Sequence, residues 1–507
     1  MPLWAAVAAG LVAVAAALAA GHLVAALTDP FASPFLAVGN TAIDLTPHPV
    51  KDFAIRAFGE NDKPVLLAGM GFAIASAAAV AGLLSRRSPL PGTVLAVALG
   101  VVGIAAVLTR PTLGVTAVVA PSTSLVVGVL VFRWLHRTAR RSSESAVDSS
   151  PGVGRRRFLI TTTAVAAAAG ATAVAGRFIG GRVDVEASRR SIRLDPDATA
   201  PDIPAGADFT GAGTPPFITP NADFYRVDTA LSVPRMRAQD WRMRVHGMVD
   251  RELVLTYDDL LNRPLVEKTI SLCCVSNEVG GPYTSTADFI GVSLRDLLAE
   301  AGVQPGADQL ATRSVDGWTC GTPVADIMAP GSDALLAVGM NGEPLPAEHG
   351  FPVRMVVPGL YGFVSATKWL VDAELTTFAD FDPYWVKRGW ARRAPIKTMS
   401  RVDRPKAFEQ VPAGRFVAAG VAWAQRKGVD KVEVRVDGGP WRSTTLSAEV
   451  NADTWRMWRV ELDLAAGSHT LEVRATDRTG HTQTSERAEP IPDGAAGWHT
   501  IVFTARP

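Results

Sequence analysis

The sequence has few cysteines and almost no excess charge of either sign. Three thiols in 507 residues, Cys273, Cys274 and Cys320, cannot form a disulfide framework, and no Cys-x-x-Cys pair offers a zinc site. The 50 lysines and arginines balance 49 aspartates and glutamates, which argues against a basic nucleic-acid binder and against an acidic tail protein. A mean hydropathy of +0.17 with 48% apolar residues also excludes a disordered chain.

Motifs for nucleotide binding and serine hydrolysis are missing too. No Gly-x-Gly-x-x-Gly follows an expected strand, and no phosphate-loop motif occurs. No Gly-x-Ser-x-Gly turn is found either. The sequence therefore supports neither a nucleotide-binding fold nor an α/β-hydrolase.

Charge is distributed unevenly along the chain. The first 150 residues carry 17 charged side chains and the other 357 carry 82. Five charge-free runs each reach the roughly 18 residues that cross about 30 Å of hydrocarbon as a helix. Buried helices of a soluble core are the alternative, which five runs within 176 residues disfavour. We therefore expect five transmembrane helices, in residues 1–28, 64–85, 88–109, 111–132 and 158–176.

Arginine placement predicts the orientation of these helices. Arg86 and Arg87 follow the second run, and seven arginines lie in 133–157, between the fourth and fifth runs. Placing both clusters in the cytoplasm puts the N-terminus inside, and it puts a loop at 29–63 and everything after the fifth helix outside. The first run lacks a basic segment and is too long for a cleaved signal peptide. We expect a multi-pass cell-membrane protein whose C-terminal part is extracytoplasmic.

The fifth run begins with an arginine cluster, Arg155-Arg156-Arg157-Phe158-Leu159. This segment resembles a twin-arginine export signal, here placed inside the chain. Such signals carry folded, cofactor-loaded proteins across a membrane. An ordinary basic helix end is the alternative, but the Ala/Thr/Gly composition of 161–176 favours export because an alanine-rich helix inserts poorly by itself.

Histidine is scarce in the apolar runs, so we predict no haem. A b-type haem commonly takes two histidine ligands. Only His22 lies within a run, while His48 and His136 are expected in loops.

The charged remainder of the chain mixes short strands and helices. Residues 241–245 alternate like a strand, a helix is expected to begin at 257, and 292–302 reads as an amphipathic helix. Towards the end, apolar residues alternate in 432–436, 458–462 and 471–475 between turn signals, which predicts an antiparallel β-sandwich.

The expected organisation is an α+β protein behind a membrane region. Residues 1–140 hold four transmembrane helices, and 141–182 hold the basic segment and the fifth helix. Residues 183–220, rich in Pro, Asp and Gly, form a linker or wrapping arm. An α+β domain follows in 221–404, and an immunoglobulin-like β-sandwich in 405–507.

The candidate site is the segment 270–281, where an apolar strand runs into Cys273 and Cys274 and then a polar turn with a glycine pair. A strand that opens into a glycine-rich loop lets backbone approach a cofactor closely. Successive strand side chains point to opposite faces, so we expect one thiol to be a ligand or nucleophile and the other to be packed. From these residues alone, a structural thiol and a Cys–His nucleophile using His349 both remain open.

The segment also carries a resemblance. Cys274-x-x-Asn277 after a strand is similar to the molybdenum-ligating cysteine of the sulfite oxidase superfamily of molybdopterin enzymes. The sandwich resembles the carboxy-terminal dimerisation domain of that family, and the similarity covers about residues 215–507. Further similar segments, in matching order, are 223–226, 241–247, 349–354, 357–359 and 365–370.

The resemblance implies a molybdenum cofactor with one molybdopterin, and Cys274 as the metal-binding thiolate. One dithiolene and one thiolate give molybdenum soft sulfur ligands and leave room for oxo groups and substrate. Arg226 and Trp390 match positions at the substrate pocket, although Arg226 could instead face the pterin. For Arg354, Lys368 and His349 the alternatives are ordinary strand or loop residues. The positions matched to pterin binding are Asp316, His349, Arg354, Ser365, Thr367 and Lys368.

Departures from the family concern the substrate. Glu278 and Val279 stand where sulfite oxidases carry anion-binding arginines, and Trp390 stands where they carry a tyrosine. The segment 361–363 is similar to the exported methionine-sulfoxide reductases of the superfamily. We expect a sulfoxide-like or other neutral substrate rather than sulfite.

Other functions and partners also follow from these features. A sulfite oxidase-type dehydrogenase and a non-catalytic membrane-anchored surface protein are the alternatives, and a transporter is disfavoured because the helices have almost no ionisable residues. The resemblance implies a homodimer, and the membrane region would lie beside a quinone or a separate cytochrome as electron partner.

Overall fold

The computed structural model describes residues 1–47, 50, 53–54, 57–58, 61–110, 113–148, 152–180 and 183–507, so His48 lies outside the described residues. The chain forms two units, which are treated separately below. One is Met1–Asp184 with Ala230–Ser232, and the other is Val185–Thr229 with Val233–Pro507.

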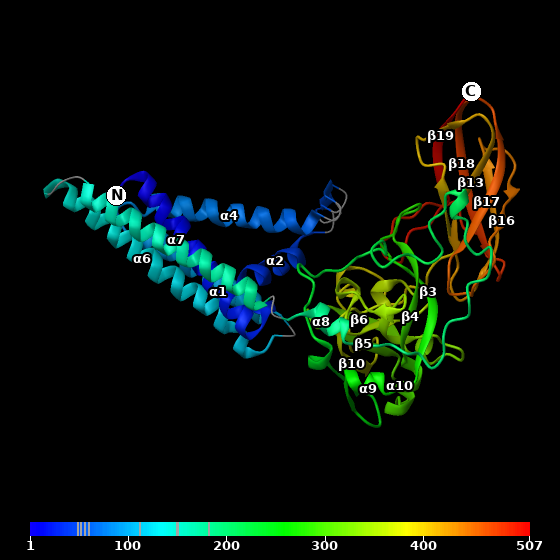
Figure 1. Cartoon of the computed structure of the whole chain (residues 1–507), viewed down its shortest axis with the longest axis horizontal. Helices are drawn as coiled ribbons and strands as arrows, with labels where there is room; N and C mark the ends of the chain where they lie inside the picture. Colours follow the sequence, from blue (N-terminus) through cyan, green and yellow to red (C-terminus); the bar gives the residue numbers. More distant parts are fainter. Residues whose placement is uncertain are drawn as a thin grey trace. The chain divides into compact units, whose positions relative to one another are not determined.

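The first unit is helical, and the expectation of five long apolar helices is confirmed (Figure 1). Helix α1 packs against α4, α6 and α7. Glycines permit the close approach of α1 and α4, because a Cβ on Gly10 would lie 2.1 Å from the Ala78 carbonyl oxygen and one on Gly82 would lie 2.2 Å from that of Ala6. The helices are α1 (Leu3–Thr28), α2 (Pro34–Leu45), α4 (Asp62–Leu84), α5 (Leu90–Leu108), α6 (Val119–Asp148) and α7 (Gly152–Gly180).

Two features of this unit differ from the sequence-based expectations. The interval 29–63 contains the helix α2, which begins with Pro34 after Ser33. The placement of His136 in a loop was wrong, because α6 continues past the apolar run to Asp148. His136 is buried, and its Nε2 lies 2.8 Å from the Ser85 carbonyl oxygen. A helix needs only its own backbone hydrogen bonds to continue, so the loss of hydrophobicity after Phe132 did not mark its end.

The second unit begins with an arm and an α+β domain. Within the arm, α8 (Val185–Arg190) is followed by a parallel bridge between Ala198 and Val266. Two sheets form the domain, with strand orders β2-β1-β10-β5-β6 and β3-β4-β7-β8, and β9 pairs with β7. The elements are β1 (Arg242–Gly247), β2 (Leu253–Thr256), α9 (Tyr257–Leu261), β3 (Leu265–Cys273), β4 (Thr284–Ser293), α10 (Leu294–Ala301), β5 (Gln309–Ser314), β6 (Thr319–Pro323), α11 (Val324–Met328), β7 (Leu335–Met340), β8 (Glu343–Pro344), β9 (Arg354–Val356) and β10 (Leu370–Thr376).

The last hundred residues form two facing sheets, with orders β11-β13-β17-β16 and β12-β19-β18-β14-β15. Alternating apolar residues of both sheets share one core that includes Val434, Trp458 and Val473. The strands are β11 (Met399–Arg404), β12 (Gln410–Pro412), β13 (Gly414–Trp423), β14 (Val429–Val436), β15 (Arg442–Ser443), β16 (Thr445–Leu446), β17 (Arg456–Leu464), β18 (Gly467–Asp477) and β19 (His499–Arg506).

The sandwich contacts the β3–β4 hairpin of the α+β domain directly. The Ser271 amide donates to the Asp453 carbonyl oxygen at 2.9 Å, and the Trp455 amide donates to Ser271 Oγ at 2.8 Å. Arg401 donates from Nη1 to the Gly281 carbonyl oxygen at 2.8 Å, while its Nε pairs with Asp403. The turn that carries the candidate cysteines is therefore braced by both domains.

Candidate functional site

The two adjacent thiols lie in different surroundings, as strand geometry predicts. Cys273 ends β3, and its Sγ accepts a hydrogen bond from Thr284 Oγ1 at 3.3 Å. Cys274 begins the turn between β3 and β4, and its Sγ lies 2.9 Å from Ser276 Oγ. Asn277 closes this turn, because its Oδ1 accepts from the Tyr283 amide at 2.8 Å. Cys273 thus anchors the hairpin, and Cys274 is left to face the site.

The protonation of both thiols is governed by burial. Burial raises the pKa of Cys273 to about 12. Burial also raises the pKa of Cys274, while hydrogen bonds with Ser276 and the positive charge of Lys368 oppose the rise. A thiolate at Cys274 therefore needs a cation against it, and a bound metal ion provides one.

Tyr225 lies between the thiols and a buried arginine. Burial raises the pKa of its hydroxyl well above the usual value, the nearby cysteines raise it further, and Arg354 opposes them. The ring stacks on Phe224 at 5.4 Å and lies 6.2 Å from the ring of Tyr283 in the cysteine turn. Its hydroxyl therefore stays protonated and can donate a hydrogen bond inside the site.

Arg354 is a buried cation without an acidic partner among the described residues. Arg354 is the first residue of β9. Its Nη1 donates to the His349 carbonyl oxygen at 3.2 Å, and its guanidinium lies over the Phe289 ring. Its Nε has no hydrogen-bond partner in the described part of the chain, and burial lowers its pKa to about 10. Buried charges are normally paired, so this guanidinium indicates the position of a bound anion.

Lys368 connects several of the predicted residues. Its Nζ donates to Asp228 Oδ2 at 2.9 Å, and Arg226 Nε donates to the same oxygen at 3.0 Å. Burial lowers the pKa of Lys368 to about 8, while Asp228 opposes the shift. Burial raises the pKa of Asp316, with the negative charge of Asp228 adding to the rise and Lys368 opposing it, so these groups lie together.

His349 is next to Arg354, whose guanidinium donates to the His349 carbonyl oxygen. Its Nε2 lies 3.0 Å from the Asn221 carbonyl oxygen, and its ring meets Phe224 edge to face at 5.4 Å. Burial, with help from the charge of Arg354, lowers its pKa to about 4. The imidazole is therefore neutral at physiological pH.

The two hydroxyl residues support the backbone around this cluster. Ser365 Oγ donates to the carbonyl oxygens of Leu360 and Tyr361, at 3.0 and 3.1 Å. Thr367 Oγ1 lies 2.7 Å from Thr312 Oγ1 on β5. Both side chains are fully buried and hydrogen-bond within the protein.

Trp390 lies in an aromatic group with Phe363 and Trp385. Its ring is 5.7 Å from Phe363 and 6.1 Å from Trp385, and its buried Nε1 has no partner in the described part of the chain. The neighbouring Gly362 approaches the turn closely, since a Cβ there would lie 3.7 Å from both the Cys273 carbonyl oxygen and the Tyr225 hydroxyl.

Tyr225 and Asp228 are two residues of this cluster that the sequence patterns left without a role. Tyr225 belongs to the segment 223–226 that carried the resemblance, next to Arg226, and Asp228 follows two residues later. Charged residues directly after the aromatic pair Phe224-Tyr225 could have suggested a site in this segment. Only the fold shows that Asp228 pairs with Lys368.

These residues fit a molybdenum cofactor. Among the described residues no three of His, Cys, Asp and Glu converge on one metal position. Arg354 offers a buried cation for an anionic cofactor group, and Cys274 offers the sulfur. The fold and these side chains are those expected of a molybdopterin-binding oxidoreductase.

Known proteins share this architecture. A family model described as the oxidoreductase molybdopterin binding domain matches residues 230–385. Sulfite oxidase of Gallus gallus is 30% identical over 317 residues, covering 53% of this chain and 68% of that protein. Mitochondrial sulfite oxidase of Homo sapiens is 31% identical over 325 residues, covering 54% of this chain and 58% of its own. The chain belongs to the sulfite oxidase family of molybdopterin oxidoreductases.

More distant relatives agree on the fold. Nitrate reductase [NADH] 1 of Oryza sativa subsp. japonica is 29% identical over 336 residues, which cover 53% of this chain and 36% of that protein. The structure of the sulfane dehydrogenase SoxCD from Paracoccus pantotrophus matches with a TM-score of 0.50 at 24% identity, over 57% of this chain and 84% of that one. The chain spans about three fifths of the length of the curated relatives it matches first, at 58%, 62% and 58%.

Proposed function

We propose that this protein is a membrane-anchored, extracytoplasmic oxidoreductase that transfers an oxygen atom and two electrons at molybdenum. The observation that carries the proposal is the buried guanidinium of Arg354, which has no acidic partner among the described residues. It lies near the Tyr225 hydroxyl, which in turn lies near the Cys274 thiol. When bound, the cofactor supplies the oxygen-atom and two-electron chemistry. The alternative of a non-catalytic surface protein does not explain why the Arg354 guanidinium is buried, because burial removes the charge from water and lowers the stability of the fold.

Each residue then has a task. Cys274 holds the metal and tunes it, while Arg354 and Lys368 neutralise the anionic groups of the pterin. Neutral His349 and the backbone held by Ser365 and Thr367 fix its ring, with Asp316 accepting from its donors. Tyr225 and Trp390 have N–H or O–H groups suited to a substrate oxygen, and Arg226 lies at the exposed margin of the cluster, with 40% of its side chain accessible.

The proposed substrate is a sulfoxide or another neutral oxygen donor. Glu278 is acidic and Val279 is apolar, so neither side chain provides a cation for an oxyanion. The protonated Tyr225 hydroxyl and the Trp390 indole are neutral donors, which suit an S=O oxygen without a full negative charge. The second candidate is sulfite oxidation, which the identity to sulfite oxidases favours.

Assays with purified enzyme test the direction of the reaction. We expect turnover of aryl and methionine sulfoxides with a reduced viologen as electron donor. We expect little or no reduction of ferricyanide by sulfite. Turnover of sulfite alone would refute the proposed substrate. A Tyr225→Phe variant should lose sulfoxide turnover but keep its molybdenum, whereas equal activity would exclude the hydroxyl as a donor.

Membrane placement and partners complete the proposal. The five apolar helices support anchoring in a membrane, with the N-terminus in the cytoplasm and the catalytic unit outside. Export of that unit through the internal twin-arginine segment and electron exchange with a quinone or a separate cytochrome follow from this placement. A homodimer through an immunoglobulin-like sandwich remains a prediction from the family resemblance.

A further inference from the structure

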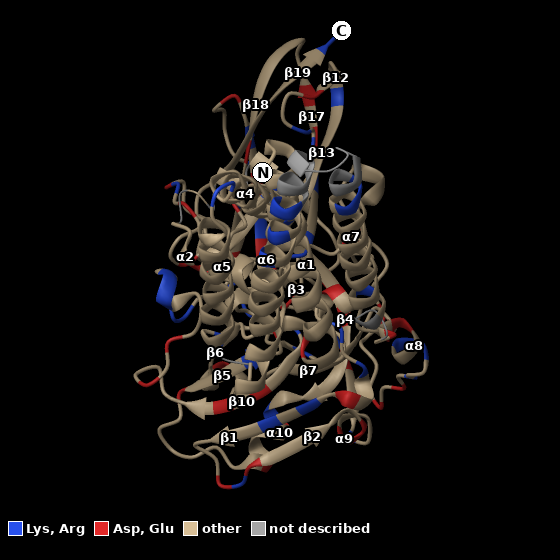
Figure 2. Ribbon diagram, turned by 90° about the vertical axis from the view of Figure 1, so that its left-hand side faces the viewer, with Lys and Arg blue, Asp and Glu red and all other residues tan. Residues whose placement is uncertain are grey.

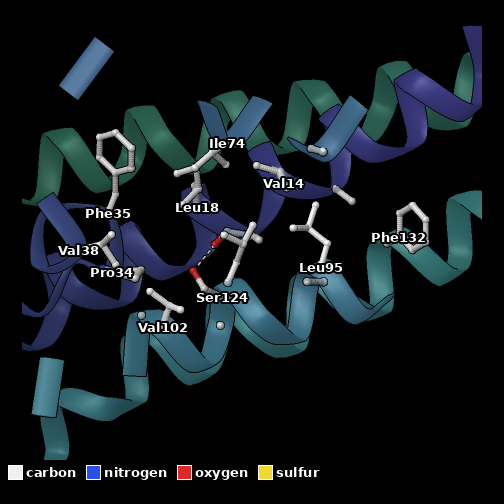
Figure 3. Close-up of a pocket in the computed structure, with 18 of the residues that line it drawn as sticks. Val14, Leu18, Pro34, Phe35, Val38, Ile74, Leu95, Val102, Ser124 and Phe132 are labelled. Atoms are coloured by element: carbon white, nitrogen blue, oxygen red, sulfur yellow. Dashed lines mark hydrogen bonds between the residues drawn. The ribbon is translucent and has the colours of Figure 1, made fainter. Parts of the chain in front are cut away.

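An elongated apolar cavity of about 220 Å³ runs through the helical unit (Figure 3). Helices α1, α4, α5 and α6 each contribute one face to it, and α2 contributes Pro34, Phe35 and Val38 at one end. On α5 the lining residues recur every three or four positions, from Gly92 through Ala96 and on to Gly103, which is one continuous face of a helix.

The length of the cavity corresponds to one leaflet of a bilayer. The eleven helical steps from Gly92 to Gly103 correspond to about 16 Å at 1.5 Å per residue. The hydrocarbon core is about 30 Å thick, so the cavity spans about half of it. A single hydrocarbon chain anchored at one membrane surface therefore fits its length.

The interior offers almost nothing polar to an occupant. Ser124 carries the only hydroxyl among the lining residues, and its Oγ already donates to the Ala17 carbonyl oxygen at 2.6 Å (Figure 3). Any polar head group of the occupant must therefore lie beyond one of the two ends.

The two ends differ in charge. At the Pro34 end, Arg110 is paired with Asp44 at 3.1 Å. At the other end, the cavity finishes where the Phe132 ring packs on Gly92. Arg86 and Arg87 lie shortly before Gly92 in the sequence.

Basic residues of two elements meet at this second end. His136 Nε2 lies 2.8 Å from the Ser85 carbonyl oxygen, and the Gly92 amide donates to Ser85 Oγ at 2.8 Å, so the start of α5 and the last part of α6 are fixed side by side. In Figure 2 the ribbon positions coloured for Lys and Arg gather on the helices near the N-terminus. Exposed arginines with no acidic partner among the described residues are Arg86, Arg87, Arg133 and Arg137.

We propose that this cavity binds one acyl chain of an anionic phospholipid, whose phosphate lies against the arginines at the basic end. The proposal rests on the membrane placement given under the proposed function, and not on the molybdenum chemistry. Basic groups at a membrane surface attract anionic head groups. An apolar cavity as long as one leaflet selects a lipid over a soluble anion. A quinone, which has an uncharged head group, would gain less from the arginines than a phosphate does.

Lipid binding to the full-length protein tests this site. The detergent-purified chain is stripped of lipid and titrated with dioleoyl phosphatidylglycerol, dioleoyl phosphatidylcholine or ubiquinone, and bound molecules are counted by native mass spectrometry. We expect one tightly bound phosphatidylglycerol per chain, preferred over phosphatidylcholine by about 25-fold if two arginines contribute. The double variant Arg86→Gln/Arg87→Gln should reduce this preference several-fold, and adding Arg133→Gln and Arg137→Gln should bring it to nearly one.

Paired substitutions on α5 test the apolar part. Ala96→Phe fills the cavity and should abolish tight binding of phosphatidylglycerol, whereas Val101→Phe changes a residue that is 53% exposed and outside the cavity, and should leave it intact. Equal affinity for the two phospholipids, displacement of the lipid by ubiquinone, or unchanged binding in Ala96→Phe would overturn the proposal. Membrane extraction and molybdenum content of the same samples report separately on the proposed function.

Discussion

Arg354→Met removes the one buried cation of the site that has no acidic partner among the described residues. Burial lowers the pKa of Arg354 from 12.5 to about 10, so the folded apoprotein disfavours its charge by about 3 kcal/mol at pH 7. Methionine fills similar volume without charge, but it loses the hydrogen bond to the His349 carbonyl oxygen, which is worth about 1 kcal/mol. The variant apoprotein should therefore be more stable by about 2 kcal/mol.

The same substitution should have the opposite effect on the loaded enzyme. The anion that compensates Arg354 is absent from the apoprotein and present with the cofactor, so Arg354→Met should lose most of its molybdenum. Thermal unfolding of apoprotein from cells grown without pterin synthesis should show the midpoint of the catalytic unit raised by roughly 4 to 8 °C.

A matched control is Arg244→Met, whose guanidinium is half-exposed and paired with Glu252. Its stability should change by less than about 0.5 kcal/mol, with molybdenum retained. Lower apoprotein stability in Arg354→Met, or full molybdenum occupancy, would refute the assignment of Arg354 to a cofactor anion.

Three further predictions concern export, domain contact and pH. Replacing Arg155 and Arg156 with lysine should trap the catalytic unit inside the cell while the first four helices still insert, and unchanged protease accessibility from outside would contradict this. Arg401→Met should destabilise the second unit by about 3 kcal/mol, because it removes the partner of the Asp403 carboxylate. The double variant Arg401→Met/Asp403→Leu should restore stability in thermal unfolding. His349 and His499 both have a pKa lowered to about 4 by burial, so the unfolded chain binds more protons between pH 4 and 6.5. Stability should fall as pH drops through that window, by at most roughly 3 kcal/mol per histidine, and a flat melting profile there would contradict it.

Local patterns were enough to predict much of the secondary structure. The helix α10 has Leu294, Leu297 and Leu298 buried on one face and ends at Gly302, whose φ of 73° is the left-handed conformation that favours glycine. The long apolar helices and the alternating strands β14, β17 and β18 were predicted for the same reason, because each pattern is set by residues close in sequence.

Contacts between distant segments were beyond such patterns. The helix α2 is amphipathic and carries Asp44, so no long apolar run revealed it. Asp228 joins Lys368 across 140 residues. Tyr225 meets the cysteine turn only because its segment lies against β4, where the Tyr225 amide donates to Ser285 Oγ. Cys274, by contrast, was assigned through the family resemblance, on its spacing to Asn277, whose side chain closes the same turn. Its role as the metal ligand stays a prediction.

Metal analysis of three purified proteins tests the central claim most directly. Roughly one molybdenum atom per chain is predicted for the unchanged protein and for Cys273→Ser, whose sulfur only anchors the hairpin. Cys274→Ser should lose the metal or bind it much more weakly. A fully folded, unchanged protein without molybdenum, or a Cys274→Ser variant that keeps it, would contradict the account.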